Sequence, residues 1–459
     1  MDMLERIADG LWQPWLLGLF LLVGLWCSIG SGFFQFFDFT TWWKGSIGSL
    51  LQAKERQGRG GLTQFQALST ALASTIGTGS IAGVATAIFF GGPGAVFWMW
   101  VSALVGLMTS LVEKTLAVKY RRRTKTGWEG GPMEYMARLG WKGAGKWFSL
   151  WCILASLTGG ALVQSNSISA ALHAALGWNR LWVGVAVAVC TGVVILGGIG
   201  RVGRVSEKLV PTMALLFLAT GTAVIAAHAG AILPALRQIV TCAFTPSAAL
   251  GGASGYGVSA ALRYGVARGV FTNEAGVGSS AMAHAAADAE SPVQEGYWGM
   301  FEVFFATIVV CSVTALCILT SGVYDPAAAL TAIREGSVTG AMTGAPLSAA
   351  AFSTLFGRWG SLIVAVCLLL FAFTSLLGWS YYGERGLAHL TGERKLRWFF
   401  RVAFLTTVVA GSIGGVGQVW ALSDICNGLM ALPNLLAVAV LAPEVWGDLK
   451  REREAPYRK

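Results

Sequence analysis

The chain has 459 residues, of which 55% are hydrophobic and only 12% charged, and its mean hydropathy is +0.62. A soluble domain of this length has no interior large enough to hide so much apolar surface, so a soluble fold is excluded. The formal net charge of +10 would suit a nucleic-acid partner. The placement of the basic residues in loops between apolar runs excludes that class.

Apolar runs long enough to cross a bilayer, about 20 residues each, recur along the chain between short polar loops. The first run has no basic segment before it and no small-residue cleavage site after it, so we expect a span and not a signal peptide. The sequence therefore predicts an all-α integral membrane protein. We count eleven runs, at about 14–34, 65–90, 94–117, 147–175, 181–200, 208–230, 257–285, 296–322, 357–382, 398–415 and 419–443.

Alternate loops differ strongly in basic charge. If the loop after the first run is cytoplasmic, 26 Lys and Arg residues lie on the cytoplasmic side and five on the other side. This bias predicts an outer amino terminus and a cytoplasmic carboxyl terminus. The basic cluster at 121–125 is expected to anchor this topology and to have affinity for anionic membrane lipid.

The second run is interrupted by the sequence STIGTGSIAG at 74–83. Glycines and hydroxyls at bilayer depth are tolerated where a helix breaks inside the protein or lines a cavity, so Gly77, Thr78 and Gly79 predict such a break. Close helix packing through Gly79 and Gly83, a GxxxG pair, is the alternative. In the fourth run, the amides of Gln164 and Asn166 need partners. Hydrogen bonding between helices and contact with a substrate both remain open for them.

The seventh run carries Thr272, Asn273 and Glu274 in a glycine-rich centre, so it is predicted to break as well. The two interrupted runs lie five runs apart, the spacing of a five-plus-five inverted repeat whose broken helices meet at the membrane midplane. Free N–H groups at such breaks suit a carboxylate, whereas carbonyls and hydroxyls suit a bare cation. The predicted division of the chain is a leading span and connector at 1–64, repeats at 65–230 and 231–445, and a cytoplasmic tail at 446–459.

A carboxylate inside the membrane is a functional hypothesis by default. Glu274 could carry a coupling proton, bind the substrate ammonium, pair with Arg268, or bond to freed backbone. For Asp424, near the start of the last run, we favour a structural partner. Glu113 and Glu302 are placed near loop ends, where we expect them to snorkel or to pair with neighbouring basic residues.

The ninth run contains adjacent hydroxyls, Thr374 and Ser375, in the sequence FAFTSLLGWSYYGERG. Bonding back to their own helix is one interpretation, as serine and threonine often do in membranes. Coordination of a cation is the other, because a sodium ion wants oxygen ligands.

The segment GGPGAVFWMWVSALVG at 91–106 resembles the signature of the alanine/glycine:cation symporter family along its whole length. This resemblance implies a leucine-transporter type of fold with an extra leading helix. It also implies sodium-driven uptake of small neutral amino acids such as alanine or glycine, of either hand in some members, across a prokaryotic plasma membrane. Further blocks resemble the family in the same order, over about residues 14–445: STIGTGSIAGVATAI, GGPMEYM, VQSNSISAAL, FTNEAGVGSSAMAHAA and LGWSYYGER.

The resemblance also implies two sites. Ser80 departs from the family pattern, which usually has asparagine at this place, and a serine keeps an oxygen but shortens the reach. The implied sodium ligands are the backbone carbonyls of Ala73, Ile76 and Phe371 and the hydroxyls of Thr374 and Ser375. The implied substrate contacts are Thr75, Gly77, Thr78, Gly79, Gln164, Asn166, Phe271, Thr272 and Trp379.

Sodium-coupled import by alternating access is therefore our main interpretation. A proton-coupled transporter on the same fold would depend on Glu274. A channel or a transport-like receptor would show flux without accumulation, or binding without flux. The sequence signals no clustered catalytic set and no obligatory protein partner, so we expect no enzyme.

Overall fold

The computed structural model describes residues 3–50, 61–124, 127–245, 254–289, 291–338, 343–392, 396–414 and 416–454. Within these residues the chain is almost entirely helical. The leading segment contains α1 (Met3–Leu11), α2 (Pro14–Gly30), α3 (Phe34–Phe37), α4 (Phe39–Gly45) and α5 (Ile47–Leu50). The next part contains α6 (Gln64–Thr75), the 3₁₀ turn η1 (Thr78–Ser80), α7 (Ala82–Gly91), α8 (Gly94–Lys119), β1 (Arg122–Thr124), β2 (Gly127–Glu129), α9 (Pro132–Arg138), α10 (Lys142–Ala155), the π-helical η2 (Ser156–Val163), α11 (Gln164–Leu176), α12 (Arg180–Ile195) and α13 (Gly198–Ala227).

The second half of the chain is again a series of helices. It contains η3 (Ala229–Ala231), α14 (Ile232–Phe244), α15 (Ser254–Asn273), α16 (Ala281–Ala285), α17 (Pro292–Val303), the π-helical η5 (Phe304–Cys311), α18 (Ser312–Thr320), α19 (Pro326–Glu335), α20 (Gly344–Phe356), α21 (Arg358–Thr391), α22 (Leu396–Ile413) and α23 (Val416–Glu454). Strands β1 and β2 form a small antiparallel hairpin in which Arg122 faces Glu129.

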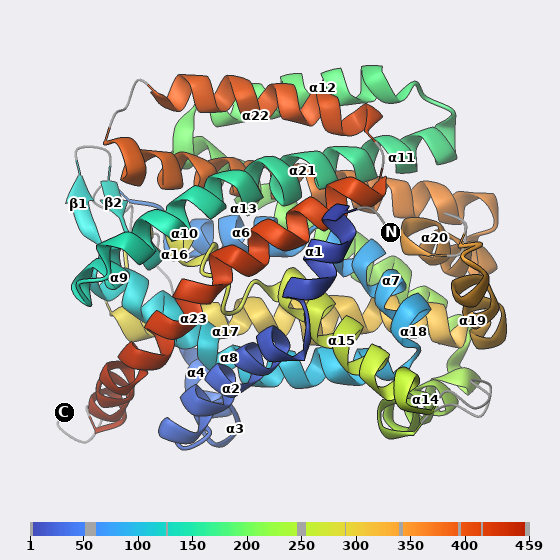
Figure 1. The fold of residues 1–459 in the computed structure, drawn as a ribbon, viewed down its shortest axis with the longest axis horizontal. Coiled ribbons are helices and arrows are strands. Elements are labelled where there is room, and N and C mark those ends of the chain that lie inside the picture. The colour runs from blue at the N-terminus through green and yellow to red at the C-terminus, as the bar shows by residue number, and fades with distance from the viewer. Residues whose placement is uncertain are drawn as a thin grey trace.

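The described residues contain seven helices that are long and apolar enough to cross a membrane. Shorter apolar helices, such as α2, α7 and α12, accompany them. An all-α membrane architecture is thus confirmed, whereas the total of eleven spans and the five-plus-five repeat stay predictions. In Figure 1, α12 and α22 run side by side along one edge, and α23 crosses the front of the molecule over α10 and α8.

The first predicted break is present between α6 and α7. Helix α6 begins with a capping box, in which Thr63 and Gln66 each accept a hydrogen bond from the other's backbone N–H. The helix ends at Thr75, and η1 follows as a single tight turn before α7 begins at Ala82. The chain is buried throughout this stretch, as a break at bilayer depth requires.

The second predicted break follows α15. Glu274 has a φ of 53°, one of two positive values recorded for a residue other than glycine in the described chain. Gly276 and Gly278 also have positive φ, of 89° and 86°. A Cβ on Gly276 would come within 2.7 Å of Leu435, so the sharp turn and the close packing both require glycine here. Both broken runs are therefore confirmed.

Part of the charge pattern lies outside the described residues. These positions are Lys54, Arg56, Arg59, Lys125, Arg394, Lys395, Arg458 and Lys459. Lys114 is one of the 26 basic residues counted as lying in cytoplasmic loops. It is instead fully buried in α8. Helix α8 continues to Lys119, one full turn beyond Lys114, and packs against α15 and α17.

Candidate functional site

A small cavity with an empty volume of about 460 Å³ lies between the two breaks. The first break contributes a polar rim of backbone and hydroxyl groups, and the second contributes Phe271 and Glu274. The complete lining is Trp12, Ser74, Thr75, Gly77, Gly79, Gly159, Gln164, Val270, Phe271, Glu274, Val277, Trp379 and Asn427.

Gln164 joins the cavity wall to the first break. Its Oε1 accepts a hydrogen bond from the backbone N–H of Thr78 at 3.3 Å, and its Nε2 donates to the carbonyl of Gly159 at 3.2 Å. Gly159 lies in the π-helical segment η2, and such wide turns often occur at functional sites. The wide turn leaves the Gly159 carbonyl facing the Gln164 amide, so the amide is held in place at the cavity.

The structure gathers most of the predicted substrate residues around this cavity. Thr78 and Thr272 lie beside the lining, and the Thr272 hydroxyl donates to the carbonyl of Arg268 at 2.8 Å. Asn166 is turned elsewhere, because its Nδ2 donates to the carbonyls of Gly411 and Gly414 at 2.9 and 2.8 Å. Asn166 therefore ties α11 to the end of α22. The predicted residues that line the cavity are Thr75, Gly77, Gly79, Gln164, Phe271 and Trp379.

Two of the predicted sodium ligands, Thr374 and Ser375, lie where α21 passes the end of α6. The Ser375 hydroxyl donates to the carbonyl of Ser74 at 3.1 Å, and a Cβ on Gly77 would lie 3.1 Å from the same hydroxyl oxygen. The Thr374 hydroxyl donates to the carbonyl of Phe371 at 3.0 Å, in its own helix. Of the other predicted ligands, Ala73 is in the last turn of α6, and Ile76 directly follows that helix.

An aromatic and charged layer closes one side of the cavity. The rings of Phe271 and Trp420 lie 5.4 Å apart, and the Arg268 guanidinium lies over both, at 5.7 and 5.2 Å. Trp12, from the segment before α2, lines the cavity and donates its Nε1 hydrogen to the carbonyl of Asp424 at 2.9 Å. Trp12 is a cavity residue without a sequence signal, because nothing in a leading segment indicates that it folds back over the cavity.

Arg268 pairs with Asp424, with 3.0 Å between Nη2 and Oδ2. The predicted alternative in which Arg268 pairs with Glu274 is therefore wrong. A structural partner for Asp424 is thereby confirmed. Glu274 instead accepts a hydrogen bond from the Ser279 hydroxyl, and its backbone N–H donates to the carbonyl of Val270 at 2.9 Å. Arg268 lies in α15, whereas the positive φ of Glu274 turns the chain at the end of that helix.

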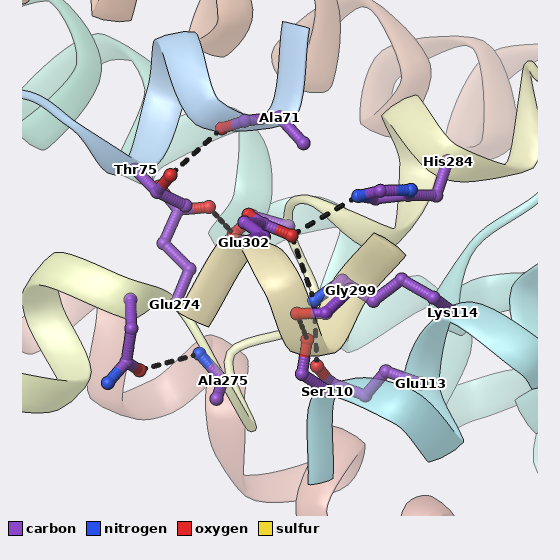
Figure 2. A network of polar contacts seen from close by, with 12 residues as sticks. Ala71, Thr75, Ser110, Glu113, Lys114, Glu274, Ala275, His284, Gly299 and Glu302 are labelled. Atoms are coloured by element: carbon purple, nitrogen blue, oxygen red, sulfur yellow. Dashed lines mark hydrogen bonds and ion pairs between the residues drawn. The ribbon is translucent and has the colours of Figure 1, made fainter. Parts of the chain in front are cut away.

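A buried charged cluster lies directly behind Glu274 (Figure 2). Glu113 and Glu302 are fully buried, so their predicted positions near loop ends are wrong. Both carboxylates contact the ammonium of Lys114, at 3.5 and 3.6 Å, so pairing with a basic residue is confirmed. Glu113 also accepts from the Asn434 amide at 2.5 Å. In the sequence, the adjacent opposite charges of Glu113 and Lys114 near the end of an apolar run could have indicated a buried ion pair.

Two broken helices that frame a small cavity, inside a bundle of long apolar helices, define a secondary transporter. A family model described as the sodium:alanine symporter family matches residues 1–456, and the chain belongs to that family. The protein is therefore a multi-pass membrane transporter and not an enzyme, and sodium is the co-transported ion.

Relatives of the chain match over nearly its whole length. The sodium/alanine symporter AgcS of Methanococcus maripaludis is 37% identical, over 99% of this chain and 97% of that protein. An uncharacterized transporter of Haemophilus influenzae is 39% identical, over 98% of this chain and 95% of that protein. A probable sodium/glutamine symporter, GlnT of Bacillus subtilis, is 36% identical, over 98% of this chain and 91% of that protein.

Solved structures support the transporter fold. The crystal structure of a manganese transporter of Eremococcus coleocola has a TM-score of 0.53 and is 17% identical, over 83% of this chain and 78% of that chain. At this identity the likeness shows the fold alone. It agrees with the leucine-transporter type of fold that the sequence motifs imply.

Proposed function

We propose that this protein imports small neutral amino acids, glycine and alanine of either hand, D-alanine included, together with sodium by alternating access. One observation carries the proposal: the cavity lies between the two broken helices, beside the place where Ser375 reaches the carbonyl of Ser74. Substrate and ion would therefore bind next to each other. Each would raise the affinity for the other by the same factor, as linkage requires.

The chemistry of the cavity wall supports a zwitterionic substrate. Free N–H groups of the break at Gly77 and Gly79 suit the substrate carboxylate. Gln164 already bonds the N–H of Thr78, so it fixes the shape of this backbone. The carboxylate of Glu274 also lines the cavity, and it suits the substrate ammonium. The rings of Trp12, Phe271 and Trp379 fill the space that a large side chain would need.

We further propose a sodium site formed by the carbonyls of Ala73, Ile76 and Phe371 and the hydroxyls of Thr374 and Ser375. The oxygen-rich composition of this set suits a sodium ion. All five residues are buried, so the ion would be held away from water.

Uptake of labelled alanine and glycine into proteoliposomes tests both proposals. An inward sodium gradient is compared with an inward proton gradient at matched membrane potential. Sodium-driven accumulation that is lost in Thr374→Ala/Ser375→Ala supports them. Thr406→Ala/Thr407→Ala is the matched control, because these adjacent hydroxyls of α22 bond to carbonyls of their own helix.

Proton coupling through Glu274 is the second candidate, since this carboxyl group lines the cavity and is held by Ser279. Accumulation driven by protons alone, and abolished by Glu274→Gln, would favour it over sodium coupling. Flux without accumulation, or binding without flux, would favour a channel or a receptor.

We also propose the orientation that the basic loops predict, with the amino terminus outside and the carboxyl terminus in the cytoplasm. Reporter fusions at each end test it. A fluorescent protein that folds only in the cytoplasm is expected to be active at the carboxyl terminus and dark at the amino terminus.

A further inference from the structure

His284 lies between two carboxyl groups in the cluster behind the cavity. Its Nδ1 is 2.7 Å from Oε1 of Glu295, and its Nε2 is 3.2 Å from Oε2 of Glu302. All three side chains are fully buried. Figure 2 shows the imidazole of His284 turned toward Glu302, which also faces Lys114.

This geometry requires a proton. A neutral imidazole has one N–H and one lone pair, whereas an ionised carboxylate can only accept. With His284 neutral and both glutamates ionised, the lone pair of one ring nitrogen would face an anion at hydrogen-bond distance. An imidazolium satisfies both contacts, as does a neutral ring that accepts from one protonated glutamic acid. In either form, the three side chains hold one proton more than a neutral histidine and two carboxylates.

The surroundings cannot replace that proton. Lys114 is the ammonium next to Glu302, and it is shared with Glu113. The other carboxyl group, Glu295, accepts a neutral hydrogen bond from Gln64 at 3.1 Å. Arg121 is a cation near Glu295, but it donates its hydrogen bonds to backbone carbonyls. Without the proton, a ring lone pair and a carboxylate oxygen would therefore face each other, both buried, with no hydrogen between them, which is costly.

Other charged and titratable groups approach the triad from the elements packed around it. Helix α4 meets α17 through Trp43 and Phe301, and it meets η5 through Trp42 and Phe304. Besides Glu113 and Lys114 of α8, the groups are Arg121 near both Glu295 and Asp288, Glu274 and Tyr382 near Glu302, Tyr135 of α9 near Glu113, Glu129 of β2 with Arg385 of α21, and Glu452 of α23 on Tyr297.

The triad joins elements that adjoin both breaks. His284 is on α16, the short helix directly after the second break, whereas Glu295 and Glu302 are on α17. Gln64 is the first residue of α6, whose other end is the first break. A movement of α16 relative to α17 therefore separates the ring from the anions that hold its proton.

We propose that Glu295, His284 and Glu302 form a proton-binding site, occupied in this conformation, which releases its proton to water when sodium and amino acid bind at the cavity. The site is separate from the carboxyl group of Glu274, which Ser279 holds. The proposal rests on the proposed function, because that function supplies the ligands that move α16.

Calorimetry of the purified full-length transporter tests the proposal. Alanine is titrated into protein with sodium chloride, at one pH, in buffers that differ in ionisation enthalpy. The slope of observed heat against ionisation enthalpy gives the number of protons exchanged. We expect a slope that differs from zero for the unmodified protein, of up to about one proton.

Glu302→Gln is the decisive variant. Its amide would donate to Nε2 of a neutral His284, so the triad no longer needs a proton, and we expect binding with a slope of zero. Glu295→Gln does the same on the other side of the ring and serves if the first variant fails to fold. Glu335→Gln, on the exposed face of α19, is the matched control and is expected to keep the original slope.

A zero slope for the unmodified protein, or an unchanged slope in both triad variants, would overturn the proton site. If no buffer gives sodium-dependent heat, the proposed function fails, and the link between the triad and transport fails with it.

Discussion

Arg268 of α15 and Asp424 of α23 form an ion pair, with Nη2 3.0 Å from Oδ2. Both side chains are less than a fifth exposed. The pair lies next to Phe271 and Trp12, which line the cavity, so it fixes the layer that closes one side of the candidate site.

Neutralising one member of this pair is expected to be more harmful than neutralising both. Arg268→Gln or Asp424→Asn leaves a largely buried charge without its partner, which costs on the order of 3–5 kcal/mol for a fully buried pair and less at this exposure. The double variant removes both charges. Sodium-driven alanine uptake and thermal unfolding should therefore show a coupling of about 0.5–3 kcal/mol between the two sites.

Arg451→Gln is the control for that cycle. Arg451 pairs with Asp448 on the surface, and its side chain is 76% exposed, so uptake should not change. Strictly additive effects of Arg268→Gln and Asp424→Asn would contradict the assigned partnership.

Gln164 and Asn166 are expected to differ in function although both carry amides on α11. Gln164→Leu removes the acceptor of the Thr78 N–H at the cavity, so we expect a higher KM for alanine. Asn166→Ala removes two hydrogen bonds to α22, so we expect a loss of stability of about 1–3 kcal/mol with little change in KM. Uptake kinetics and thermal unfolding of the two variants separate these roles. A raised KM in Asn166→Ala alone would reverse the assignment.

Gly77→Ala is expected to impair transport strongly. The added methyl group would lie 3.1 Å from the Ser375 hydroxyl oxygen and 3.3 Å from Oε1 of Gln164, tighter than ordinary contacts. It would therefore push on both proposed sites at once. Sodium dependence of alanine uptake is the measurement, and a shift to higher sodium concentrations is the expected result. Gly18→Ala is the control, because nothing lies within 4 Å of a Cβ at Gly18.

Trp379→Leu is expected to widen the range of substrates. Removing the indole enlarges the cavity, and each additional methylene that then fits is worth about 1–3 kcal/mol. Competition of larger neutral amino acids against labelled alanine should improve about tenfold or more. Trp182→Leu, at a side chain that is 69% exposed on α12, should leave the competition profile unchanged. If Trp379→Leu also leaves the competition profile unchanged, Trp379 does not contact the substrate.

The positions of the breaks followed from the sequence because their cause is local. Glycines and hydroxyls in STIGTGSIAG and the run from Thr272 to Gly278 disfavour a continuous helix at bilayer depth, whatever surrounds them. The residues directly at these breaks, such as Thr75, Gly79 and Phe271, consequently line the cavity.

Partners that are distant in sequence did not follow from it. Arg268 lies 156 positions from Asp424, and Trp12 lies 412 positions from the carbonyl that it bonds. A single sequence gives no information about such pairs. Only the packing of α15 and the leading segment against α23 brings them together.

The sequence by itself determined the membrane architecture, the two broken helices and the family, because composition, local glycine content and contiguous motifs carry them. Only the tertiary structure decided that Asn166 bonds α22, that Arg268 pairs with Asp424, and that Lys114 is buried with Glu113 and Glu302. Hydropathy measures the average environment of a segment. It does not measure which face of a helix is covered, and the burial of a charge depends on the helices that cover that face.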